Sequence, residues 1–327
     1  MALKDSIRRH PALLEIALLA RNAWLHLPFA TRETERIGST HQEDTPAEAV
    51  AYISRVFDDY LRYGEVSRAE LEGARVLEIG PGDNVGLALR LIGAGAERVV
   101  CVERFHVWRD QKHEARIYAA LLEQAASEER LRMEDAVTIS DVGIQLNGDR
   151  VQRVEGVGIE NADQILDASG FDLVVSRVAL EYVQGMRAAL RVMDKALAPG
   201  GLAIHKIDLR DHGLYTGAGH HPLSFLRRSA IAWRTMATRS GVPNRWRESD
   251  YVGAFEVLGY ETTSLITHVT GEAEELDPHA AELSDATIRR IQPNIDAYRR
   301  SLAVKFRHRS LRDLAVAGIF LRAKKAV

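Results

Sequence analysis

The chain has 327 residues, 46% of them hydrophobic and 27% charged, so its length and composition are those of a globular protein with a large core. Its net charge of −3 excludes the strongly basic surface that nucleic-acid-binding domains carry, and we expect no nucleic-acid partner. Cys101 is the single cysteine, which excludes an intrachain disulfide and favours a reducing, cytoplasmic location.

The sequence of residues 1–70 predicts a helical N-terminal cap. An apolar run at 12–20 follows several basic residues, but Glu15 interrupts it, and it is too short to span a bilayer. This pattern favours one or two amphipathic helices packed on the rest of the protein, with peripheral contact to a membrane or a lipid substrate as the alternative. A polar stretch at 31–45 is expected to be a loop, after which Pro46 begins a second helical pattern.

The most informative pattern lies at residues 75–105. A short apolar run ends in a tight turn, Gly80-Pro81-Gly82, and a helix-length apolar segment follows at 85–92. A second apolar run, at 99–102, ends at Glu103. The order strand, turn, helix, strand is that of the first half of a nucleotide-binding α/β fold.

Details of this turn distinguish between cofactors. Glu103 follows Gly82 by 21 residues, about where an acid binds ribose hydroxyls, so the sequence predicts an adenosine-containing cofactor. The dinucleotide pattern G-x-G-x-x-G would need a glycine at Val85, which argues against NAD. Glu78, two residues before the first glycine, suits a positively charged ligand better than a pyrophosphate.

Three stretches in order resemble the motifs of class I S-adenosylmethionine-dependent methyltransferases: VLEIGPGDNVG at 76–86, GFDLVVS at 170–176 and LAPGGL at 197–202. Asn84 stands where many members have a third glycine. The resemblance implies an α/β fold, with a Rossmann-like seven-stranded sheet and helices on both faces, over residues 71–327. It also implies S-adenosylmethionine as the cofactor and S-adenosylhomocysteine as its product.

The resemblance and the apolar pattern together place the remaining elements. A helix is expected at 108–127 and an extra strand or hairpin at 133–142, and the third, fourth, fifth and sixth strands are expected at 151–159, 171–176, 202–208 and 261–269. A final strand at 314–323 is expected to be antiparallel and to close the sheet edge. The connection at 209–247, which leads to a helix at 246–260, and a helical insertion at 270–310 are expected on the substrate side.

The matched motifs imply a set of cofactor-binding residues. Glu160 and Asn161 follow the third strand and are the candidates for contact with the adenine amine, although a helix N-cap is the alternative reading of these residues. The complete set is Glu78, Gly80, Gly82, Asn84, Glu103, Arg104, Glu160, Asn161, Ser176 and Arg177.

The methyl acceptor should lie over the carboxyl ends of the fourth and fifth strands, near 176–182 and 205–212. His212 is the leading candidate for a general base because imidazole titrates near neutrality. His205 and His221 are further candidates for that role. A histidine in a polar loop is otherwise exposed or simply hydrogen-bonded.

Asp208 and Asp211 flank the leading histidine and are candidates to orient it or to bind a divalent cation. The sequence shows no tight ligand spacing, so we predict no metal site. Glu181, His221 and Arg245 are candidates for contact with the substrate, with ion pairing or surface solvation as the alternative.

These observations predict a methyltransferase that acts on a small molecule, by O-methylation of a hydroxyl on a secondary metabolite, a sugar or a lipid-linked intermediate. The cap and the insertion favour a covered pocket. Methylation of carbon or nitrogen is the first alternative. An NAD-dependent oxidoreductase or a non-catalytic binding protein is the second. The sequence leaves the oligomeric state open, with a homodimer among the options.

Overall fold

The computed structural model describes residues 10–24, 43–107, 109–168, 170–237 and 241–327. The expected N-terminal helix is present as α2, Pro11–Trp24, and the second helical pattern as α4, Pro46–Tyr63. Thr45 caps α4 with a capping box in which its side chain and that of Glu48 bond each other's backbone N–H groups. Most of the loop predicted at 31–45 lies outside the described residues.

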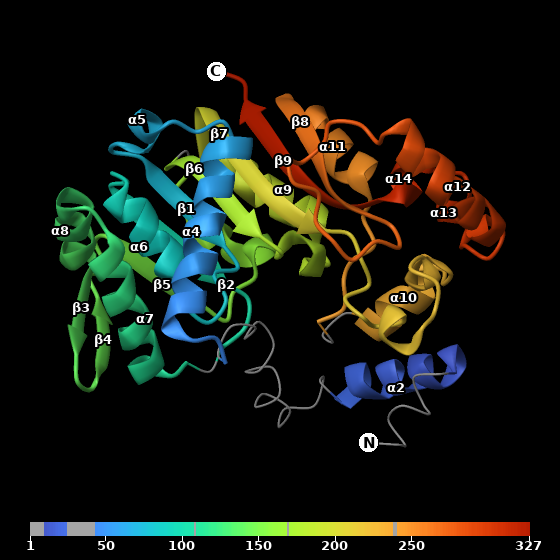
Figure 1. The fold of residues 1–327 in the computed structure, drawn as a ribbon, viewed down its shortest axis with the longest axis horizontal. Coiled ribbons are helices and arrows are strands. Elements are labelled where there is room, and N and C mark those ends of the chain that lie inside the picture. The colour runs from blue at the N-terminus through green and yellow to red at the C-terminus, as the bar shows by residue number, and fades with distance from the viewer. Residues whose placement is uncertain (1–9, 25–42, 108, 169, 238–240) are drawn as a thin grey trace.

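A seven-stranded sheet forms the centre of the molecule (Figure 1). Its first five strands in the chain are parallel, and they are followed by two antiparallel pairings that involve the last strand. The spatial order is β5-β2-β1-β6-β7-β9-β8, and the bounds are β1 Arg75–Ile79, β2 Arg98–Glu103, β5 Val151–Glu155, β6 Phe171–Arg177, β7 Leu197–Asp208, β8 Tyr260–Val269 and β9 Val316–Lys325.

The position of the last strand differs from the expectation. β9 is antiparallel as predicted, but it lies between β7 and β8, so β8 forms the edge of the sheet. The sequence of β9 agrees with this inner position, because residues 316–321 are all buried and a strand that packs on both faces needs a continuous apolar run. The prediction that this strand closes the sheet edge is therefore wrong.

Two other parts of the chain also differ from what the sequence predicts. The third parallel strand ends at Glu155 and a 3₁₀ helix, Ile159–Gln164, follows it. The helix expected at 108–127 is present as α7. A further helix, α8, takes up the first part of the stretch expected as a strand or hairpin at 133–142, and a small hairpin of β3 and β4 follows it. Their bounds are α7 Gln111–Gln124, α8 Ser127–Ala136, β3 Val137–Ser140 and β4 Gly143–Leu146.

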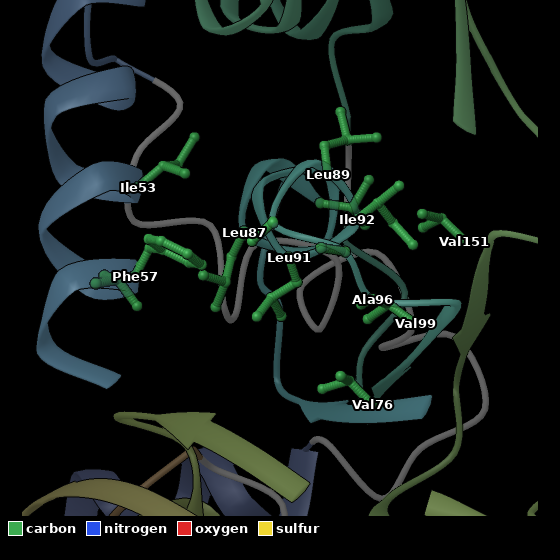
Figure 2. Packing of buried hydrophobic residues seen from close by; sticks show 14 of the residues in the cluster. Ile53, Phe57, Val76, Leu87, Leu89, Leu91, Ile92, Ala96, Val99 and Val151 are labelled. Carbon is green, nitrogen blue, oxygen red and sulfur yellow. The ribbon is translucent and has the colours of Figure 1, made fainter. Parts of the chain in front are cut away.

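Helices cover both faces of the sheet because successive strand residues point to opposite sides. Val76 packs with α4, α6 (Gly86–Gly93), α7 and α8 in one core cluster, whereas Leu77 packs on the other face with α9 (Met186–Ala196) and α11 (Glu248–Val257). Figure 2 shows the first cluster, in which Ile53 and Phe57 of α4 face the side chains of α6.

A third cluster lies where α2 and α10 and the helices α12 to α14 gather (Figure 1). Its buried residues come from α2, from the 209–247 connection, from the end of β8 and from four helices, namely α10 Ala230–Ala237, α12 Asp285–Arg299, α13 Val304–Arg307 and α14 Leu311–Ala315. The two helices of the predicted cap thus pack in different places, α2 on α10 and α4 on α6 and α7. Among the described helices, none is long and apolar enough to cross a membrane.

Candidate functional site

The turn after β1 has the backbone that its two glycines predict. Gly80 and Gly82 have φ angles of 72° and 73°, in the left-handed region that favours glycine. A Cβ added at Gly80 would lie 2.6 Å from the Cβ of Ala179, so this turn also requires a residue without a side chain. Asn84 lies just before α6, which begins at Gly86, and its Oδ1 accepts a hydrogen bond from the backbone N–H of Gly86 at 2.9 Å.

A cavity of about 400 Å³ lies along this turn and the carboxyl ends of β1, β2 and β6. Most of the residues that the motifs imply for the cofactor line it: Glu78, Gly80, Gly82, Asn84, Glu103, Arg104, Glu160 and Arg177. We call it the cofactor cavity. Asn161 is exposed and Ser176 is buried inside the sheet, and neither lines it.

Glu103 ends β2 and turns its carboxylate back towards the glycine turn. Its two oxygens accept hydrogen bonds from the backbone N–H groups of Gly82, at 3.2 Å, and Phe105, at 3.0 Å. Burial raises the pKa of this carboxyl. Each carboxylate oxygen can accept a second hydrogen bond, so the group keeps acceptor capacity for ligand hydroxyls.

Glu160 and Arg104 form the other polar part of this cavity. Arg104 Nη1 lies 3.8 Å from Glu160 Oε1 and donates to the carbonyl of Tyr182 at 3.2 Å. Glu160 Oε2 is buried, and no hydrogen-bond donor for it lies within the described part of the chain. An acceptor of this kind, beside the end of the third parallel strand, suits a ligand that supplies an N–H donor.

Glu78 lies on β1 below the turn, and its carboxyl accepts a hydrogen bond from the thiol of Cys101. Cys101 is completely buried in β2, as expected for a small core residue. Burial raises the pKa of Glu78 to about 7, because desolvation disfavours the carboxylate. A cationic ligand in the cavity would favour the ionised form and lower that pKa again.

This linkage predicts that affinity for S-adenosylmethionine depends on pH. Below about pH 7 Glu78 is protonated in the free protein, so binding of a cation must expel its proton. Affinity should therefore rise by up to roughly tenfold per pH unit as the pH approaches 7, and then level off. Calorimetric titration at several pH values measures the slope. The Glu78→Gln variant should show none, and an equal slope in both proteins would contradict the linkage.

A second cavity, of about 450 Å³, lies beyond the end of β7. Asp208, Arg210 and Asp211 line it, together with Leu223 and Phe225 from the 209–247 connection. We call it the second cavity.

His212 lines both cavities and therefore stands between them. Its φ of 49° is left-handed, an unusual conformation for a residue with a side chain. Its ring lies 5.1 Å from that of Tyr182. Burial lowers the pKa of His212, so its imidazole is neutral at pH 7 and able to accept a proton.

The carboxyl in contact with His212 is that of Glu181, whose Oε1 lies 3.7 Å from His212 Nε2. Glu181 is 1% exposed, and neither of its carboxyl oxygens has a hydrogen-bond partner among the described residues. Burial and the nearby charge of Asp208 raise the pKa of Glu181 well above its usual range.

The two predicted partners of His212 are occupied elsewhere. Asp208 forms a two-pronged ion pair with Arg210, at 2.6 to 3.0 Å, and these hydrogen bonds hold its pKa low against the opposing effect of burial. Asp211 accepts from the backbone N–H groups of Gly213, Tyr215 and Thr216 and so shapes the loop that carries His212. Within the described residues, no three His, Cys, Asp or Glu side chains gather as a metal-binding group.

The remaining predicted residues lie away from both cavities. His205 is completely buried, its Nδ1 is 2.8 Å from Ser176 Oγ, and burial lowers its pKa to about 3. His221 stacks on Tyr298 with ring centroids 3.8 Å apart. Neither histidine lines the cofactor cavity or the second cavity.

Arg245 also has a structural position. Its guanidinium donates to the backbone carbonyls of Phe225, Arg228 and Ser229 and lies over the ring of Trp233, at 4.8 Å. Burial lowers the pKa of Arg245 to about 10. The side chain thus joins the 225–229 turn to the third core cluster.

We expect Arg245→Met to reduce the free energy of unfolding by about 2–4 kcal/mol, because three carbonyls lose a charged donor inside the protein. Denaturant unfolding measures this. The exposed Arg227→Met is the matched control and should have little effect. If Arg245→Met unfolds like the natural protein but weakens acceptor binding, this structural interpretation is wrong.

One wall of the cofactor cavity was not found from the sequence. Tyr52, Ile53 and Val56 of α4 line it, and Arg177 reaches α4 through an ion pair with Asp59 at 2.6 Å. The helical pattern of α4 showed an apolar face, but periodicity does not say whether such a face covers a core or a ligand.

These observations fit S-adenosylmethionine. A glycine turn with left-handed backbone, a buried carboxylate at the end of β2 and a free acceptor on Glu160 offer separate contacts for the parts of an adenosine ligand. The topology and the cavity together define a class I S-adenosylmethionine-dependent methyltransferase.

Comparison with known proteins agrees. The model of the family "Methyltransferase domain" matches residues 45–265, and the chain belongs to this family. The protein is thus a methyltransferase that uses S-adenosylmethionine, as the motifs predicted, and not an NAD-dependent oxidoreductase. Comparison with curated protein sequences gives no significant match.

Several solved structures are similar to the chain. An S-adenosylmethionine-dependent methyltransferase from Mesorhizobium loti is 17% identical, with 82% of this chain and 97% of that one covered and a TM-score of 0.40. Phosphoethanolamine N-methyltransferase 2 of Haemonchus contortus, in complex with S-adenosylmethionine, is 13% identical over 88% and 58%, with a TM-score of 0.44. The CurJ carbon methyltransferase is 12% identical over 96% and 67%, with a TM-score of 0.40.

Proposed function

We propose that this methyltransferase transfers the methyl group to a hydroxyl oxygen of a small molecule bound in the second cavity, with His212 as the general base. The observation that carries the proposal is the position of His212, which lines both the cofactor cavity and the second cavity. A base between donor and acceptor can take a proton from the acceptor during transfer.

Different residues of the cofactor cavity would bind different parts of the cofactor. Glu103 accepts hydrogen bonds from the ribose hydroxyls through the lone pairs that Gly82 and Phe105 leave free. Glu160 Oε2 accepts from the adenine amine. Gly80 and Gly82 allow close approach of the ligand to the backbone, and Glu78 supplies negative charge for its cationic end.

The cofactor supplies a methyl group on a sulfonium, which is already activated for displacement. The protein must align the acceptor oxygen with that methyl group and remove the hydroxyl proton. The neutral imidazole of His212 would take the proton that the acceptor hydroxyl loses on methylation. The negative charge of Asp208, which favours the protonated form of His212, stabilises the imidazolium that results.

The second cavity suits a small polar acceptor. Its volume of about 450 Å³ lies in the range of small-molecule sites. Asp208, Arg210 and Thr216 offer hydrogen-bonding groups, while Leu223 and Phe225 offer an apolar surface. This mixture fits a sugar or a hydroxylated secondary metabolite, including a lipid-linked one. We place the reaction in the cytoplasm, as the single buried cysteine favours.

The test is transfer from methyl-labelled S-adenosylmethionine to matched panels of hydroxyl, amine and activated-carbon acceptors. NMR of the product identifies the methylated atom. A methyl group on oxygen would support the proposal. A methyl group on nitrogen or carbon would overturn the choice of acceptor atom, although the methyltransferase assignment would stand.

A further inference from the structure

Helix α2 carries a broad apolar face that the described residues leave exposed. Leu13, Ile16, Leu19 and Trp24 are 45%, 61%, 42% and 38% exposed. The remaining exposed residues of the helix are Ala12, Ala17, Ala20, Arg21 and Ala23, so one basic side chain is the only polar group among them. Exposed apolar side chains that are gathered on one element mark a binding surface, whereas single ones do not.

The opposite side of α2 is fixed to the protein. Leu14 and Leu18 are buried in the third core cluster, and Asn22 donates to the carbonyl of Thr235 in α10 at 3.0 Å. Glu15 accepts hydrogen bonds from Arg228, at 2.6 Å, and from the hydroxyl of Tyr215, at 3.3 Å. The apolar face is therefore presented outward on a helix that is already in place.

The charge around this face is positive. Residues 212–237, which include α10, contain three arginines, Arg227, Arg228 and Arg234, and no Asp or Glu, although the whole chain has a net charge of −3. Arg21 of α2 and Arg227 and Arg234 beside or within α10 are exposed. The one acid of α2, Glu15, is paired with Arg228. Figure 1 shows α2 and α10 together at one end of the molecule, with α2 outermost.

We propose that the α2 face docks on the surface of a membrane that contains anionic phospholipids. Apolar side chains with arginines around them match the acyl boundary and the negative headgroups of such a surface. A second copy of the chain is a poorer occupant, because a twofold contact would bring two like-charged faces together.

Hydrogen bonds also link α2 to the loop that carries His212. Tyr215, whose hydroxyl bonds Glu15 of α2, donates its backbone N–H to Asp211 of that loop. Leu223 and Phe225 line the second cavity and belong to the same core cluster as the buried residues of α2. The docking helix is thus connected through packing and hydrogen bonds to one wall of the second cavity, although the docking proposal does not depend on the acceptor.

The test is sedimentation of the full chain with vesicles of phosphatidylcholine alone or of equal parts phosphatidylcholine and phosphatidylglycerol. The natural protein should sediment with the mixed vesicles and stay in solution with the neutral ones. Ile16→Glu should weaken binding roughly tenfold or more, because it places a charge on the apolar face. Val257→Glu, at an exposed apolar residue of α11, is the matched control and should bind like the natural protein.

Three results would overturn the proposal: no sedimentation with the mixed vesicles, equal binding to both kinds, or equal loss in both variants. A dimer in solution that Ile16→Glu dissociates, without vesicle binding, would assign the face to a second copy instead. Titration of Ile16→Glu with S-adenosylmethionine, which should match the natural protein, separates a lost surface from a lost fold.

Discussion

The variant His212→Asn is expected to slow methyl transfer by roughly 10²–10⁴-fold while its affinity for S-adenosylmethionine stays close to that of the natural protein. The side chain lies between the two cavities and is neutral at pH 7, so its loss removes the acceptor of the hydroxyl proton. Asparagine is the suitable replacement because it tolerates the left-handed backbone at this position, where φ is 49°. Initial rates with labelled cofactor measure the effect.

Two controls sharpen this result. His221→Asn removes a histidine that lines neither cavity and should leave the rate nearly unchanged. At saturating S-adenosylmethionine, where the pH dependence of cofactor binding through Glu78 no longer matters, the natural protein should lose activity only as the pH falls below the usual histidine range, because a base must be deprotonated and burial lowers the pKa of His212. A His212→Asn rate close to that of the natural protein would assign the proton to another acceptor.

The variant Glu103→Gln is expected to weaken binding of both S-adenosylmethionine and S-adenosylhomocysteine by roughly 10–100-fold. The carboxylate accepts from two backbone N–H groups and has room for two hydroxyl donors, so it acts only as an acceptor. In glutamine an NH₂ group, which is a donor, replaces one of the two carboxylate oxygens. The N–H and hydroxyl donors on that side would then have no acceptor. Calorimetric titration measures the loss.

Glu155→Gln provides the matched control. Glu155 ends the neighbouring strand β5, pairs with Arg153 at 2.6 Å and does not line the cofactor cavity. The Glu155→Gln variant should bind both ligands as tightly as the natural protein does. Equal affinity in Glu103→Gln and Glu155→Gln would remove Glu103 from the ligand contacts.

Local sequence patterns correctly predicted the part of the cofactor cavity that neighbouring residues in the chain form. The turn at Gly80 and Gly82 and the acid Glu103 lie within one strand-turn-helix-strand unit, where spacing along the chain fixes spacing in space. β2 contains the apolar run at 99–102 and ends at Glu103 for the same reason. Most of the predicted cofactor residues accordingly line one cavity.

The acceptor side could be predicted less well because distant segments form it. Asp208 and Asp211 were favoured as partners of His212 since they are its neighbours in sequence, but Glu181, from the end of another strand, makes the contact. His205 lies in a stretch of β7 whose residues are all buried, and its ring contacts Ser176 inside the sheet. The packing between helices and strands decides whether a polar side chain faces a cavity or a backbone carbonyl. A single sequence does not contain this information in its local patterns.

The position of β9 illustrates the same limit at the level of the fold. Its apolar run predicted a strand correctly, but an apolar run does not say which two strands will flank it, and in the structure these are β7 and β8. Only the burial of both faces, read from the structure, explains why residues 316–321 are continuously apolar.

The most direct test of the central claim is parallel calorimetric titration of the natural protein with S-adenosylmethionine, S-adenosylhomocysteine and NAD. The cofactor cavity and the family predict binding of the first two and no heat from NAD. Binding of NAD alone would contradict the account of this cavity and of the residues that line it.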